Sequence, residues 1–269
     1  MRKRTFFSLP MIAILVVATF FVGIVGFRFY STYVMEGYLG RVDGIIADAN
    51  PHIQQLNTDA AQFQGDPAGA KKVKVSFDQA ESAARDAERS LRETGTPTQA
   101  FSYHKDLISL YNATSTFAGD LSDMATYIIE RGILMSDLSL AVDKFTASAQ
   151  GAQTDVEVIN AARELTETIR STESALGRVK KPKIQIYSND AIEQSLDDLA
   201  LMTDTLAAAI EAGDVTATRA AAENIKTVLQ RDWAKTLQTA DPTGVARYQT
   251  EQGRLLRLQK KVISERQAL

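Results

Sequence analysis

The chain has 269 residues, of which 45% are hydrophobic and 23% charged, with 15 Gly, 6 Pro and no Cys. Low Gly and Pro contents favour helix, and the absence of Cys excludes disulfides, thiolate metal sites and cysteine nucleophiles. The net charge of −3 includes three N-terminal cations, Arg2, Lys3 and Arg4, so the body of the chain is more acidic still, which argues against nucleic acid as a partner.

The N-terminus has the pattern of a membrane anchor. Residues 5–27 are uncharged, and about 20 such residues in a helix cross a hydrocarbon core of ~30 Å. A cleaved signal peptide has a shorter apolar run and a small-residue cleavage site, and neither is found here. We therefore expect residues 1–4 to be cytoplasmic, held there by Arg2, Lys3 and Arg4. Residues 5–30 are then a single transmembrane helix, and the rest lies outside a bacterial-type plasma (inner) membrane.

A helical period follows the anchor without interruption. Apolar residues from Met35 to Phe63 alternate steps of four and three, which is the seam of a coiled coil. The seam stays in phase across Pro51, so we expect a kink there rather than a chain reversal. The anchor and this helix are predicted to form one rod.

Asp66-Pro67, Thr96-Pro97 and Asp241-Pro242 each predict a helix start, because a capping side chain precedes a proline at the first helical position. Between the first two lies a helix with an apolar seam. The next predicted helix, 97–149, is very long, and Arg131-Gly132 is its weak point. We expect it to be continuous, although a break near Gly132 is the alternative.

Further helices are predicted near 155–179, 190–212 and 215–239 and from Pro242, with one extended connection after residue 179. The fold class is therefore all-α: an elongated antiparallel bundle of about six to seven long helices on the anchor. From the helix lengths we expect a membrane-proximal bundle, 31–130, and a distal bundle, 131–269, that share the helix 97–149.

Little in the sequence points to catalysis. There are two His residues, His52 and His104, without metal-ligand spacing. A nucleophile elbow, a phosphate loop and a dinucleotide fingerprint are all missing. We therefore expect no enzyme activity, no cofactor and no metal. Six residues remain as candidate ligand or partner contacts, each with a purely structural role as the alternative: His104, Arg131, Lys180, Lys181, Lys183 and Tyr187.

Two charged stripes share the seven-residue period of the bundle. The acidic stripe consists of Asp190, Asp197, Asp204 and Glu211. The basic stripe consists of Arg247, Arg254 and Lys261. Carboxylates along a regular helix diverge into solvent, so a metal site is disfavoured. We predict instead that the two stripes face each other within the chain, as flanking charges do in coiled coils.

Two functions remain open. The first is a scaffold that presents helical surfaces to a protein partner or to a second copy of the chain in the cell envelope. The second is a sensor-like bundle that binds a small ligand and signals through a partner. The anchor and first bundle resemble in layout the helical ligand-binding modules of bacterial chemoreceptors and sensor kinases. The chain departs from them in having no second apolar span, no HAMP-like linker and no output domain, so the scaffold is the expected function.

Overall fold

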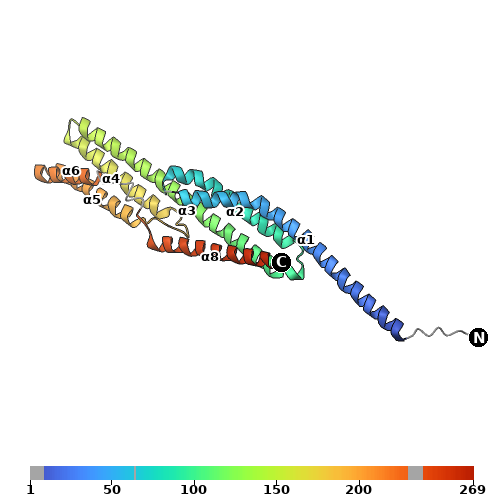
Figure 1. The fold of residues 1–269 in the computed structure, drawn as a ribbon. Coiled ribbons are helices and arrows are strands. Elements are labelled where there is room, and N and C mark those ends of the chain that lie inside the picture. Colours follow the sequence, from blue (N-terminus) through green and yellow to red (C-terminus); the bar gives the residue numbers. More distant parts are fainter. Residues whose placement is uncertain (1–8, 64, 230–238) are drawn as a thin grey trace, which may run out of the picture.

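The computed structural model describes residues 9–63, 65–229 and 239–269, and for residues 9–31 it describes the backbone alone. This part of the chain is all-α, as predicted, and elongated (Figure 1). Its helices are α1 (Leu9–Gln62), α2 (Pro67–Glu93), α3 (Phe101–Gly151), α4 (Asp155–Arg178), α5 (Asp190–Glu211), α6 (Val215–Leu229) and α8 (Pro242–Gln267), with a 3-10 turn at Thr98–Ala100 before α3.

The predicted transmembrane segment, 5–30, and the cations Arg2, Lys3 and Arg4 lie outside the residues whose side chains are described. From Leu9 the backbone belongs to α1, which continues through Pro51 to Gln62. The prediction that the chain continues as one helix through Pro51 and does not reverse there is confirmed for this range. Among the residues whose side chains the structure describes, from residue 32 onward, none of the helices has the length and apolar character of a membrane span.

The cap-plus-proline signals predict two of the three helix starts correctly. The Asp66 carboxylate accepts a hydrogen bond from the Gly69 amide before α2, and the Asp241 carboxylate accepts from the amides of Thr243 and Gly244 before α8. Thr96-Pro97 differs, because a 3-10 turn follows it and α3 starts only at Phe101. From there α3 runs unbroken past Gly132, as expected, over roughly 75 Å.

Two groups of helices pack along α3. Its first half contacts α1, α2 and α8, with Phe77, Leu91 and Leu121 fully buried between them. Its second half contacts α4, α4 contacts α5, and α5 contacts α6. Ile169, Leu196 and Leu199 form the core of this distal half. Burial of such side chains stabilises the fold by ~1.5–3 kcal/mol each.

The position of α8 corrects the predicted domain boundary, which placed residues 131–269 together in the distal bundle. α8 lies instead along the proximal half of α3 (Figure 1). Val262 joins the core of Tyr38 and Leu107, and Arg266 pairs with Asp43 of α1 at 2.9 Å. Backbone hydrogen bonds join residues 239–241 to residues 186–188 beside the middle of α3. α8 therefore starts there and runs back towards α1.

Candidate functional site: a polar groove between helices α2 and α3

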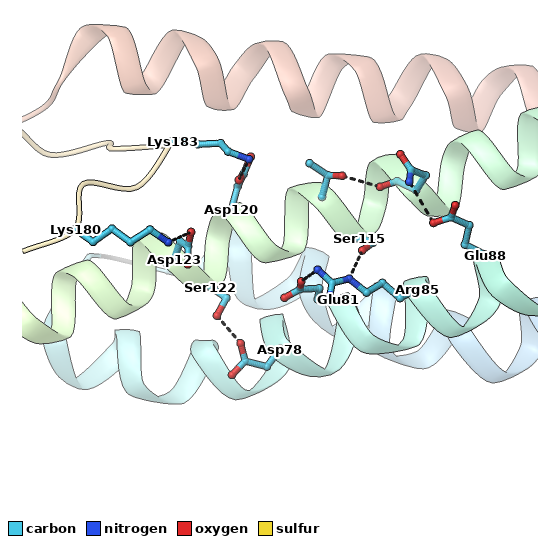
Figure 2. A network of polar contacts seen from close by, with 12 residues as sticks. Asp78, Glu81, Arg85, Glu88, Ser115, Asp120, Ser122, Asp123, Lys180 and Lys183 are labelled. Atoms are coloured by element: carbon cyan, nitrogen blue, oxygen red, sulfur yellow. Dashed lines mark hydrogen bonds and ion pairs between the residues drawn. The ribbon is translucent and has the colours of Figure 1, made fainter.

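A groove with a volume of about 660 Å³ runs between α2 and α3. Its polar lining consists of charged, amide and hydroxyl side chains from both helices and from the connection that follows α4 (Figure 2). The lining residues are Glu81, Arg85, Glu88, Arg89 and Arg92 of α2, Asn112, Ser115, Thr116, Gly119, Asp120, Ser122 and Asp123 of α3, and Lys183.

The helical period explains this groove. The apolar residues of α2, among them Phe77, Ala80, Ala84 and Leu91, face inward and are buried. The groove arginines lie next to this stripe at positions 85, 89 and 92, again in steps of four and three, so they share one side of the helix. The chain thus places a row of three arginines along one edge of a filled core.

Hydrogen bonds and ion pairs tie the two helices together across the groove floor (Figure 2). Arg85 Nε donates to Ser115 Oγ at 3.3 Å and its guanidinium pairs with Glu81. Asn112 Nδ2 donates to Glu88 Oε2 at 3.2 Å. Ser122 donates to Asp78. A Cβ at Gly119 would lie 3.1 Å from Glu81 Cδ, so glycine leaves room for this carboxylate.

The cations of the groove are exposed, and most of its anions are not. The side chains of Arg85, Arg89, Arg92 and Lys183 are 61–70% exposed. Glu81, Glu88 and Asp120 are only 10–22% exposed. The lining contains equal numbers of acidic and basic side chains, yet most of the charged groups exposed at the rim of the groove are basic. The surface therefore suits an acidic partner group.

The pKa shifts show which acids the floor holds in the charged form. Burial by itself raises the pKa of Glu88, but hydrogen bonds from Arg92 and Asn112 outweigh it and hold the pKa below its ordinary value. Asp78, which lies beside the groove, behaves alike: burial raises its pKa, but hydrogen bonds from Lys74 and Ser122 outweigh this and lower it below its ordinary value. Both carboxylates are therefore anions at neutral pH and complete the network.

Two of the predicted contact residues lie at this groove. Lys183 pairs with Asp120 at 3.3 Å, and Lys180 pairs with Asp123 at 3.2 Å. Lys181, on the same connection, is exposed. The connection is held by Ile184, which is fully buried in the proximal core. It thus brings basic side chains from beyond α4 to the end of the groove.

Arg131, His104 and Tyr187 are placed elsewhere. Arg131 is buried at the junction of the two halves, where its guanidinium lies 5.3 Å from the Tyr127 ring centroid and burial lowers its pKa. His104 Nδ1 lies 3.1 Å from the Tyr38 hydroxyl between α3 and α1. Tyr187 forms an isolated bridge with Ala240 and packs against Gly65, whose φ is +76°. None of the three lines the groove.

The charged stripes have other partners than those predicted. Asp204 pairs with Arg170 at 2.6 Å and Glu211 pairs with Arg163, both on α4. Lys261 pairs with Asp106 of α3 at 2.8 Å, and Arg254 with Glu251 of its own helix. The reason is that α8 lies on the proximal half of the bundle, away from α5. The acidic residues of α5 therefore pair with arginines of α4 instead. Asp190, Asp197 and Arg247 are exposed.

The sequence reasoning missed the α2 arginines, because it followed only the apolar seam of that helix. Their spacing of four and three was the available signal.

Comparisons with known proteins add nothing to this geometry: no protein-family model, no curated protein and no solved structure matches the chain.

Proposed function

We propose that the protein is a single-pass, membrane-anchored scaffold of the cell envelope that binds an acidic segment of a partner protein in the groove between α2 and α3. The observation that carries the proposal is the contrast within the groove between three exposed arginine side chains and recessed carboxylates. Charge of one sign at a rim steers a partner of the opposite sign and sets its orientation.

The anchor supports the location. The apolar run at 5–27 follows three cations, which is the pattern of a helix whose N-terminus stays in the cytoplasm. The bundle then lies outside the cytoplasm, in a bacterial-type plasma membrane, and the rod of α1 holds the groove away from the bilayer. Such a position suits contact with another envelope protein or with a second copy of the chain.

The packing of the buried candidates also favours a scaffold over a sensor. His104 and Arg131 were the sequence candidates for contacts with a charged or polar ligand. Both are more than nine-tenths buried and lie among protein groups. The groove, in contrast, is open and lies over a filled core of Phe77, Ala80 and Leu121.

The test is crosslinking in intact membranes followed by mass spectrometry, on the native chain and on the double variant Arg85→Glu, Arg89→Glu. We expect an acidic segment of a partner protein to crosslink to α2 or α3, and the yield to fall about tenfold in the variant, which corresponds to ~1.4 kcal/mol. The yield should also fall with added salt. Arg219→Glu, on the exposed side of α6, is the matched control and should keep the native yield.

Two results would contradict the proposal. One is a partner whose crosslinks fall on α4, α5 or α6 and persist in the double variant. The other is that no partner is captured while a small metabolite raises the melting temperature of the purified protein, which would favour the sensor. Circular dichroism of the double variant separates loss of binding from loss of fold.

A further inference from the structure

A second hollow, of different chemistry, lies on another face of the proximal half. α8 is attached to the bundle near both of its ends. Before its first turn the Asp241 amide donates to the Ile186 carbonyl at 2.8 Å, and Gly244 lies directly against the backbone of Gln185. In its last turns Lys261 pairs with Asp106 and Arg266 with Asp43. Between these attachments a cleft of about 270 Å³ remains among α1, α3 and α8.

None of the residues that line this cleft is charged. α3 forms its floor with Leu110, Thr114 and Phe117. α1 and α8 form its walls. The wall residues are Ile53, Leu56, Asn57, Ala60 and Ala61 of α1, and Tyr248, Gln252, Leu255, Leu256 and Gln259 of α8. The neighbouring cations of α8, such as Arg254 and Arg257, are exposed and do not line the cleft. The lining therefore disfavours an ion, which would lose its hydration without gaining a counter-charge.

Polar groups in the cleft are few. The Thr114 hydroxyl already donates to the Leu110 carbonyl at 2.9 Å, which leaves its methyl group for the cleft. The rings of Phe117 and Tyr248 lie with their centroids 5.6 Å apart and their planes inclined at 41°, and this aromatic pair joins α3 to α8. The amides of Asn57, Gln252 and Gln259 supply neutral hydrogen-bond donors and acceptors on the walls.

We propose that this cleft binds a neutral, mainly apolar small molecule with a flat ring system and a single hydrogen-bonding group. An apolar cavity of ~150 Å³ already holds a benzene-sized molecule, so this cleft suits one about the size of two fused rings. Small-ligand sites are mostly apolar with a few polar groups, as here. A helix, ~10 Å across with its side chains, is too large for this volume. The proposal concerns a different face from the groove and is independent of it.

The experiment maps the cleft with a neutral probe, an adamantyl diazirine, photolysed with the full-length chain and located by peptide mass spectrometry. We expect the carbene to label peptides that contain residues 53–61, 110–117 and 248–259 in preference to exposed apolar residues such as Leu201 and Val215. An excess of 2-naphthol should reduce this labelling at least fivefold. Naphthalene-2-sulfonate, of similar shape but charged, should leave it unchanged.

A variant provides the second measurement. Ala60→Phe extends a ring into the cleft and should also reduce the labelling at least fivefold. Ala208→Phe, on the exposed side of α5, makes the same change away from the cleft and should not. The competition needs no variant, so it decides the matter even where Ala60→Phe disturbs the packing. Labelling spread evenly over exposed apolar residues, or equal competition by the sulfonate, would overturn the proposal.

Discussion

At the scale of single residues, Gly132 shows how close contact determines a residue type. In the sequence it looked like the weak point of a long helix. In the structure a Cβ at this position would lie 2.3 Å from Pro67 Cγ, at the point where α2 begins against α3. The glycine therefore allows the two helices to approach each other. Gly44 of α1 is the opposite case, since no side chain lies within 4 Å of its missing Cβ.

We expect the same substitution to have opposite effects at these two sites. Gly132→Ala should lower the free energy of unfolding by about 1–3 kcal/mol, because a proline ring cannot move aside and the helices must separate. Gly44→Ala should raise it by about 0.5–1 kcal/mol through reduced backbone entropy of the unfolded chain. Urea denaturation followed by circular dichroism measures both. A stabilised Gly132→Ala variant would disprove the close contact.

His104 is a buried histidine with a lowered pKa. The residue is 8% exposed, and this burial lowers its pKa below the ordinary value of 6.5. Nδ1 lies 3.1 Å from the Tyr38 hydroxyl, and which of the two atoms donates in this hydrogen bond depends on the tautomer of the ring.

The sign of the pH dependence follows from this shift. Because the folded-state pKa of His104 is lowered, the unfolded chain binds a proton there at a higher pH than the folded chain does, so stability falls as the pH falls below 6.5. The contribution is at most about 1.4 kcal/mol per pH unit. We expect His104→Gln to flatten the fall in denaturation midpoint between pH 6.5 and 5.5. His52→Gln, at an exposed position, is the control and should keep the native slope.

At the scale of elements, α8 differs from the other helices in how it is held. Of its described residues only Gly244 and Val262 are buried. Much of its attachment comes from polar contacts near its ends, among them Lys261 with Asp106 and Arg266 with Asp43. The core helices α2, α3 and α5 instead bury long apolar stripes. α8 should therefore open at a lower free energy than they do.

Hydrogen exchange tests this difference. In the variant Lys261→Glu, Arg266→Glu we expect amides 253–267 to exchange at least tenfold faster, because buried Asp106 loses its cation and faces a like charge. Amides of α4 and α5 should keep their native rates. The pair Arg163→Glu, Arg170→Glu on α4 is the matched control and should leave α8 unaffected. Equal acceleration along the whole chain would show that α8 does not open separately.

At the scale of the whole molecule, the proposed anchor predicts on which side of the membrane the N-terminus and the bundle lie. The chain has no Cys, so a single introduced cysteine reports its own side of the membrane. Ala208 is an exposed position of α5, in the half of the bundle farther from α1 (Figure 1). Thr5 lies at the start of the predicted span.

We expect Ala208→Cys to react with a membrane-impermeant maleimide in intact spheroplasts, and Arg4→Cys to react only after permeabilisation. If the anchor is retained, as we propose, the N-terminal sequence of the mature protein should also begin ahead of residue 27. Reaction of both cysteines from the same side, or a mature start near residue 27, would show that the segment 5–30 is not a membrane anchor.

Local patterns were sufficient for most of the helices. The seam of α1 predicted a helix that continues through Pro51, and the long α3 was predicted as unbroken. The caps Asp66 and Asp241 marked the starts of α2 and α8. These features depend on residues three to seven apart, whose interactions do not require the rest of the fold. For the site, the sequence reasoning included Lys180 and Lys183 but missed Arg85, Arg89 and Arg92.

The sequence by itself determined the helical class, the length of α3 and the apolar faces of helices such as α1, α2 and α3, because these follow from the helical period and from local capping. Only the tertiary structure decided which helices are neighbours. It placed α8 beside α3 and α1, joined the acidic stripe of α5 to α4, and opened the groove and the cleft. Pairing of this kind depends on where connections such as 179–189 lead the chain, and exposed charge stripes, worth only ~0.2–1 kcal/mol per pair, are too weak to override it.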